Sequence, residues 1–239
     1  MAASENAHSF LASIFRGFRG LIVTPAAREN PPRPEQMLEL YEFEGCPFCR
    51  KVREVMSELD LNYISRTCAG GALKKRAEVA EVGGKVQFPL LVDPNRDQRL
   101  YESEDIIDYL HETYGDGRRG AMRSRVLSPL NTTGAAMATL VRPRGRRVKA
   151  GLEDREQPAA LLVLYGFETS PFCRKVREAL NELNLDYEVR NVAKKSYRRP
   201  ELVKRGGRMM VPYLIDRNRD KEMYESDEIV AYLHKHYGP

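Results

Sequence analysis

The stretch that decides the fold occurs twice in this chain. Residues 46–54 read CPFCRKVRE and residues 170–178 read SPFCRKVRE, so eight of the nine positions are identical. Each stretch follows a short strand-like segment, at 38–43 and 162–167, and its second residue is a proline, which suits the first turn of a helix. Recurrence at a spacing of 124 residues indicates a duplicated unit.

The similarity continues downstream. FPLLVDPNRD at residues 88–97 returns as VPYLIDRNRD at 211–220, and YESEDIIDYLH at 101–111 returns as YESDEIVAYLH at 224–234. Two copies of about 80 residues are too few for a solenoid and indicate two tandem domains. We therefore expect a leader at 1–36, a first domain at 37–115, a basic linker at 116–159 and a second domain at 160–239.

Hydrophobic periodicity predicts the order βαβαββα for each copy. In the first copy, apolar residues at helical spacing indicate a helix from Cys46 to Leu59, and a Glu-Ser pair opens a final helix from Ser103 to Tyr114. The remaining elements are a strand at 62–66, a helix at 73–80 that ends near Gly83, and strands at 90–92 and 99–101.

Composition narrows the class of protein. The 239 residues are 42% hydrophobic and 31% charged, as in ordinary soluble domains, and no apolar run reaches the ~18–20 residues of a membrane-spanning helix. Residues 116–156 carry ten basic and four acidic side chains but no aromatic one, so we expect no specific nucleic-acid partner. A cytoplasmic location is the default, because the N-terminus lacks the basic start of a signal peptide.

The leader and the linker resemble each other. Residues 10–19 read FLASIFRGFR and residues 137–147 read MATLVRPRGRR, so both combine apolar residues with arginine just before a domain. Each predicts a short amphipathic helix that packs on its own domain or on the other copy. Weak contact with an anionic membrane surface is the alternative for such basic stretches.

Cys46 and Cys49 form a Cys-x-x-Cys pair where a strand meets a helix. The amides and the positive dipole end of a helix N-terminus stabilise a thiolate there, and Arg50 and Lys51 add positive charge. A Cys46 thiolate would attack a disulfide, and Cys49 would resolve the mixed disulfide. The alternatives are an inert pair or a zinc site, for which Cys68 is a third ligand without an evident fourth; we expect no metal.

The second copy has Ser170 in place of Cys46 and keeps Cys173. A cysteine three residues into the helix lies on its second turn, so we expect Cys173 to be a small packed residue rather than a nucleophile. The second copy has then lost exchange chemistry and serves binding or structure.

The motifs in this order resemble the thioredoxin-like fold, and most closely glutaredoxins and the N-terminal domain of glutathione transferases. The resemblance covers residues 37–115 and 160–238 and implies an α/β protein of two tandem thioredoxin-like domains joined by a basic linker. Glutathione transferases continue from this domain into a helical domain that builds the electrophile pocket. Here a basic linker follows the first copy, which disfavours conjugation of bulky electrophiles.

The resemblance also implies a glutathione site in each copy. Pro89 and Pro212 would be cis, with the backbone of Phe88 or Val211 pairing with the cysteinyl part of glutathione, and Ser170 would stabilise a glutathione thiolate. The residues implied to hold the γ-glutamyl end are Glu102 and Ser103 in the first copy, and Glu225 and Ser226 in the second. A structural reading of Ser103 also stands, as the N-cap of the last helix.

Three hypotheses follow. The first is a glutathione-dependent thiol–disulfide oxidoreductase with Cys46 as nucleophile, glutathione as cofactor, and glutathionylated or disulfide-containing proteins or small molecules as substrates. The second is a non-catalytic glutathione-binding protein related to glutathione transferases, or a conjugating transferase. The third is a metal or iron–sulfur carrier formed by Cys46 and glutathione between two chains. In each case the two domains could pack around a local two-fold axis, like a homodimer.

Overall fold

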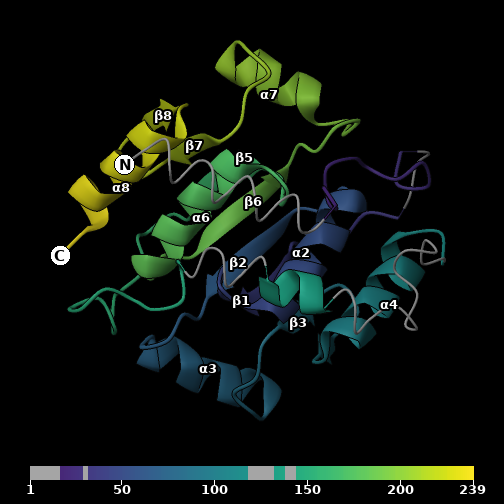
Figure 1. Ribbon diagram of the computed structural model, residues 1–239, viewed down its shortest axis with the longest axis horizontal. Coiled ribbons are helices and arrows are strands. Elements are labelled where there is room, and N and C mark those ends of the chain that lie inside the picture. The colour runs from purple at the N-terminus through teal and green to yellow at the C-terminus, as the bar shows by residue number, and fades with distance from the viewer. Residues whose placement is uncertain (1–16, 29–31, 118–131, 138–143) are drawn as a thin grey trace.

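The computed structural model describes residues 17–28, 32–117, 132–137 and 144–239 (Figure 1). The first copy consists of β1 (Leu38–Glu42), α2 (Pro47–Glu58), β2 (Tyr63–Thr67), α3 (Leu73–Gly83), β3 (Leu90–Asp93), β4 (Gln98–Leu100) and α4 (Ser103–Tyr114). The second consists of β5 (Leu162–Gly166), α6 (Pro171–Glu182), β6 (Tyr187–Asn191), α7 (Arg199–Gly206), β7 (Tyr213–Asp216), β8 (Lys221–Met223) and α8 (Ser226–Tyr237). Both copies follow the predicted order.

The two copies share one eight-stranded sheet, in the order β4-β3-β1-β2-β6-β5-β7-β8. Its centre is an antiparallel pair of β2 and β6, in which Ile64 lies opposite Glu188. These two residues are 124 positions apart, so they are equivalent members of the repeat. An antiparallel pair centred on equivalent residues places a local two-fold axis between the copies, as in a homodimer, and it covers the inner edge of each half-sheet.

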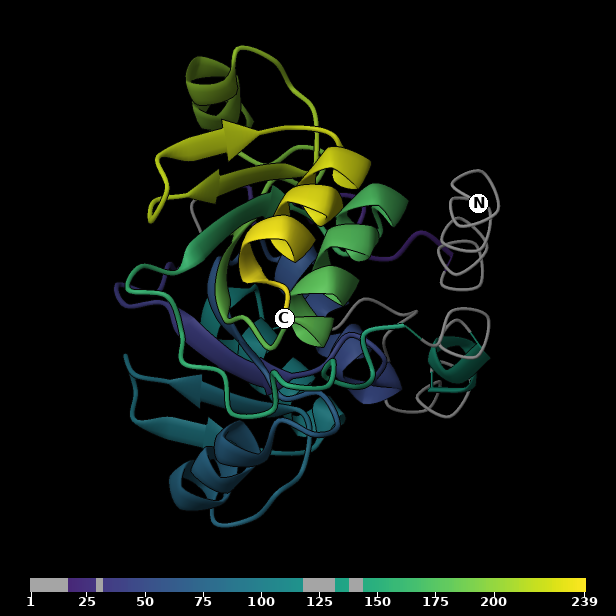
Figure 2. The ribbon, with the colours of Figure 1, turned by 90° about the vertical axis from the view of Figure 1, so that its left-hand side faces the viewer.

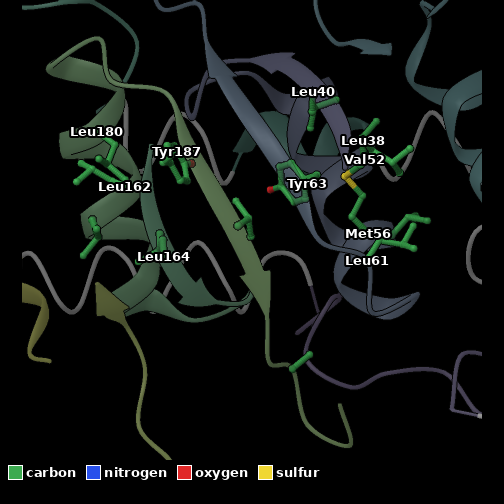
Figure 3. Packing of buried hydrophobic residues seen from close by; sticks show 14 of the residues in the cluster. Leu38, Leu40, Val52, Met56, Leu61, Tyr63, Leu162, Leu164, Leu180 and Tyr187 are labelled. Carbon is green, nitrogen blue, oxygen red and sulfur yellow. The ribbon is translucent and has the colours of Figure 1, made fainter. Parts of the chain in front are cut away.

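The helices divide between the two faces of the sheet. One large core lies under α2, α4, α6 and α8 and includes residues of both copies, among them Leu40, Met56, Leu164 and Leu180 (Figure 3). On the other face, α3 and α7 each cover a separate small core at opposite ends of the molecule (Figure 2). The copies are therefore joined by a common apolar layer as well as by the β2–β6 pair.

Buried ion pairs connect α2 and α6 across the local axis. Arg53 Nε donates to Glu168 Oε2 at 2.8 Å, and Arg177 Nε donates to Glu44 Oε2 at 2.9 Å. The two pairs are equivalent under the repeat, and all four side chains are buried. Because a buried charge is tolerated only with its partner, this network, which we call the seam network, fixes the second copy against the first.

The leader and the linker occupy equivalent places as well. We call residues 20–24 the leader arm and residues 144–149 the linker arm. Gly20 N and Gly145 N donate to the carboxylates of Glu58 and Glu182, at 2.9 and 3.2 Å. Further along, Val23 N bonds Lys194 O and Val148 N bonds Gly70 O, both at 2.9 Å. The leader arm thus runs from α2 to the loop after β6, and the linker arm runs from α6 to the loop after β2.

The amphipathic helices predicted at 10–19 and 137–147 do not reach their predicted C-terminal ends. Residue 137 ends a helical segment at 132–137, residues 17–20 form a turn and residues 145–146 form a bend, while residues 10–16 and 138–143 lie outside the described residues. Gly20 and Gly145 have φ values of +77° and +67°, in the left-handed region, and further along the amides of Val23 and Val148 bond to Lys194 O and Gly70 O instead of closing helical turns. No helix among the described residues has the length and apolar character needed to cross a membrane.

Candidate functional site

Cys46 is the N-cap of α2, at the point where the chain leaves β1 and enters the helix. Its Sγ accepts a hydrogen bond from Cys49 N at 3.2 Å, and Pro47 occupies the first turn, where no amide hydrogen is needed. The Cys46 side chain is 4% exposed and that of Cys49 is fully buried. One sulfur therefore lies at the helix N-terminus and the other lies behind it in the core.

The environment tunes the two thiols in opposite directions. The pKa of Cys46 is lowered, chiefly by the hydrogen bond from the Cys49 thiol, with help from the Cys49 amide and the charge of Arg53. The pKa of Cys49 is raised well above its ordinary value, first by burial and then by its bond to Cys46 and the nearby carboxylate of Glu42. This pair suits exchange chemistry, because only the first sulfur is readily ionised.

Two further loops meet the Cys46 loop in the first copy. The Phe88–Pro89 peptide bond is cis, as the resemblance implies, and the Phe88 ring lies against that of Phe43 with centroids 5.8 Å apart. On the other side, an ion pair between Lys51 and Glu104 connects the first turns of α2 and α4. The fold thereby brings the Cys-x-x-Cys pair, the cis-proline loop and the start of α4 to one end of the first copy.

The sequence predicts Ser103 as the N-cap of α4, and this is wrong. Glu102 holds that position, because its carbonyl accepts the first helical hydrogen bond, from Ile106 N at 3.0 Å. Glu102 has a φ of 60°, in the left-handed region, so the chain turns into the helix at Glu102 and Ser103 is the first helical residue. Its carboxylate accepts a bond from Gln87 Nε2 at 2.5 Å, and Ser103 is buried in the first turn.

The second copy contains a cavity of about 270 Å³ in the corresponding place. It is lined by Phe172, Met210, Val211, Pro212, Glu225, Ser226 and Asp227. Four of these residues were predicted from the sequence, and the Val211–Pro212 bond is cis. The other three were missed, although the position of Phe172 in the repeated motif was a usable signal. The cavity combines apolar walls with the N-terminus of α8, an arrangement that fits a small carboxylate-bearing molecule.

Ser170 does not line this cavity. Its Oγ accepts a hydrogen bond from Cys173 N at 3.3 Å, so it caps α6 as Cys46 caps α2. Cys173 is fully buried, and burial raises the pKa of its thiol, as expected of a packed residue. A Cβ on Gly166 would lie 2.8 Å from Cys173 Sγ, whereas the first copy has Glu42 at that strand position.

Glu42 and Arg53 are site residues that the sequence reasoning missed. The Glu42 carboxylate is buried, accepts from Ser65 Oγ at 2.8 Å and pairs with Arg53. A glutamate at the end of an otherwise apolar strand was the available signal. Among the described residues, no group of three or more His, Cys, Asp and Glu side chains is placed to hold a metal ion. Cys68 is instead buried, with its sulfur 3.4 Å from Arg66 O.

Comparison with known proteins gives one family. The family model described as "Glutathione S-transferase, N-terminal domain" matches residues 40–119 and 164–239, one match for each copy. Among solved structures, a trimeric glutathione transferase of Leishmania, TDR1, is 16% identical over 84% of this chain and 68% of its own, with a TM-score of 0.31. No curated protein matches the chain.

Proposed function

This chain belongs to the family of the glutathione S-transferase N-terminal domain, and from that premise we propose that it is a glutathione-dependent thiol–disulfide oxidoreductase with Cys46 as nucleophile. The observation that carries the proposal is the opposite tuning of two adjacent thiols, a lowered pKa at Cys46 and a raised one at Cys49. A reducing compartment such as the cytoplasm is the setting that this chemistry requires.

The proposed reaction begins on a glutathionylated substrate. The Cys46 thiolate attacks the glutathione sulfur, the substrate sulfur leaves as a thiolate and takes a proton from water, and Cys46 is left in a mixed disulfide with glutathione. Cys49 then loses its proton to water and attacks Cys46 Sγ, which releases glutathione and forms the Cys46–Cys49 disulfide. Two further glutathione molecules reduce that disulfide and leave as glutathione disulfide.

The family resemblance supplies the proposed binding residues. In the first copy, the backbone of Phe88 before Pro89 would pair with the cysteinyl part of glutathione. The amides at the start of α4 would attract its γ-glutamyl carboxylate, and the exposed Glu102 carboxylate would take the ammonium group. Ser103, in the first turn of α4, would add a hydroxyl.

The test is the reduction of a glutathionylated peptide by glutathione, measured for the wild type and for Cys46→Ser and Ser170→Ala. We expect Cys46→Ser to abolish turnover, because a hydroxyl does not ionise at neutral pH, and Ser170→Ala to leave most of it. A wild type that binds glutathione without turnover would contradict the proposal and favour a non-catalytic binding protein. A coloured, iron-containing preparation would favour the carrier hypothesis instead.

A second function is favoured by the cavity of the second copy. Its lining residues match the glutathione-binding positions, and no ionisable sulfur lies at its helix N-terminus, since Ser170 stands there. We propose that this copy binds glutathione, or a similar γ-glutamyl compound, without exchange. Calorimetric titration of Cys46→Ser with glutathione would detect the site, because that variant keeps the second copy intact.

A further inference from the structure

The two arms have the same backbone path but different side chains. The repeat aligns Gly20 with Gly145, and isolated bridges pair Ile22 with Lys194 and Arg147 with Gly70. Leu21-Ile22 in the leader arm therefore correspond to Arg146-Arg147 in the linker arm. The arm with the two arginines, the linker arm, lies beside the Cys46 loop. The arm with Leu21-Ile22, the leader arm, lies beside the Ser170 loop.

Contacts place Arg146 on the residue before Cys46 and Arg147 on the loop after β2. A Cβ built on Gly45 would overlap Arg146 Cγ, so the Arg146 side chain lies directly on the backbone of the residue before Cys46. A Cβ on Gly70 would lie 3.4 Å from Arg147 Cγ, which places Arg147 over the loop after β2. The second copy has Thr169 in place of Gly45, and its hydroxyl bonds the leader at Arg19 O. Glycine at position 45 is thus what admits the arginine.

These guanidinium groups are exposed and carry unneutralised charge. Neither Arg146 nor Arg147 forms an ion pair with an acidic side chain of the described residues. The side chain of Arg76, in α3, contacts the same loop: it donates to Cys68 O at 3.1 Å and stacks on the Phe88 ring at 5.0 Å. Arg199 makes the equivalent bonds in the second copy, to Val192 O and Ala193 O. The excess positive charge at the first site therefore comes from the linker arm.

We propose that Arg146 and Arg147 form an anion-recognition edge of the Cys46 site that selects protein substrates with carboxylates beside the reacting disulfide. The inference rests on the proposed oxidoreductase function and names its substrate class. Arginine binds carboxylates in a bidentate manner, and exposed unpaired arginines attract acidic segments over several ångströms. Binding of glutathione alone does not explain Arg146 and Arg147. The second copy keeps the glutathione-binding positions, although the arm beside it carries Leu21-Ile22 instead of two arginines.

The experiment compares two glutathionylated peptides that differ only at the residues flanking the cysteine, Asp and Glu in one and Asn and Gln in the other. The variant is Arg146→Gln/Arg147→Gln. The matched control is Arg99→Gln/Arg217→Gln, which removes the same charge from exposed arginines in β4 and after β7, at the two ends of the sheet. Both kcat/KM values are measured at low and at high salt.

We expect the wild type and the control to prefer the acidic peptide by about three- to tenfold at low salt, an effect of the size of two exposed charge contacts, and less at high salt. The arm variant should lose this preference and retain the rate on the neutral peptide. No preference in the wild type, or an equal loss on both peptides, would overturn the inference, the second because it indicates a role in binding glutathione.

A second measurement distinguishes failure of the proposed oxidoreductase function from failure of the anion-recognition edge. If neither peptide is turned over, binding of the fluorescently labelled, reduced peptides to Cys46→Ser is measured by anisotropy. Tighter binding of the acidic peptide that is lost in the arm variant supports the anion-recognition edge without the oxidoreductase. Equal binding of the two peptides overturns it.

Discussion

The two halves of this molecule share a scaffold and differ at several places near one site. The first copy has Cys46, Glu42 and the arginines of the linker arm, where the second has Ser170, Gly166 and Leu21-Ile22. The seam network, the β2–β6 pair and the arms are repeated in both. Under the proposed function, exchange chemistry is confined to one half, while both halves keep the interface that joins them.

The largest effect is expected from a substitution in the seam network, which both copies share. Glu44 contacts Arg177 at 2.9 Å and Arg53 at 3.1 Å, with Arg174 3.8 Å away. Glu44→Gln would leave buried guanidinium charge uncompensated, and we expect it to lower the free energy of unfolding by about 3–5 kcal/mol. Urea denaturation followed by circular dichroism measures this, with exposed Glu225→Gln as control.

The equivalent change in the other copy should be milder. Either substitution leaves Arg53 with two carboxylates and Arg177 with one, but Glu44 also lies 3.8 Å from Arg174 and 4.0 Å from Arg50. We therefore expect Glu168→Gln to cost less than Glu44→Gln, with the difference arising from these two longer contacts. Equal losses would show that the contacts of Glu44 with Arg50 and Arg174 contribute nothing measurable.

The seam also shows what the sequence could and could not predict. The repeat and the element order followed from the sequence motifs, and both cis prolines were implied by the family resemblance. Arg50 and Arg53 of α2 occupy positions that local periodicity assigns to solvent, yet both are buried, and Arg53 pairs there with Glu168, in the loop before α6 of the other copy. A contact between two copies has no local signature, so the shared sheet, the ion pairs and the path of the arms appear only in the structure.

The same limit applies at the site. The cysteines and the residues of the cis-proline loops were identified from spacing and resemblance. Arg146 belongs to a segment that resembles an amphipathic helix, and only its backbone bonds to the other copy place it on Gly45. Ser103 was assigned as a cap because serine favours that position, but the left-handed backbone at Glu102 decided otherwise.

The next prediction concerns the reactivity of the two helix N-termini. The lowered pKa of Cys46 means that its thiolate persists below the ordinary cysteine pKa of about 8.5. Alkylation by iodoacetamide should rise with pH and level off at a lower pH than for free cysteine, with one thiol modified per chain, since the buried Cys49, Cys68 and Cys173 have raised pKa values. Mass spectrometry identifies the modified residue.

Ser170→Cys places a thiol at the N-cap of α6, so that the reactivity of the two helix N-termini can be compared directly. The backbone amide of Cys173 and the helix end are in place there, so we expect a second alkylated site with a lowered pKa. Ser170→Ala is the matched control and should add none. If the new thiol reacts only above the ordinary pKa, then the side chains near Cys46, rather than the shared helix geometry, make Cys46 acidic.

The smallest expected effect concerns the serines at the starts of α4 and α8. If each copy binds glutathione, Ser103→Ala and Ser226→Ala should each weaken one site by about three- to tenfold, the value of one hydrogen bond. Calorimetry in the Cys46→Ser background separates the two sites without turnover. Both serines are equally buried and neither is an N-cap, so a change in helix stability should be the same in both variants. A loss of affinity with Ser103→Ala alone would mean that the second copy gave up its ligand together with its cysteine, and that its cavity is a relic of the shared scaffold.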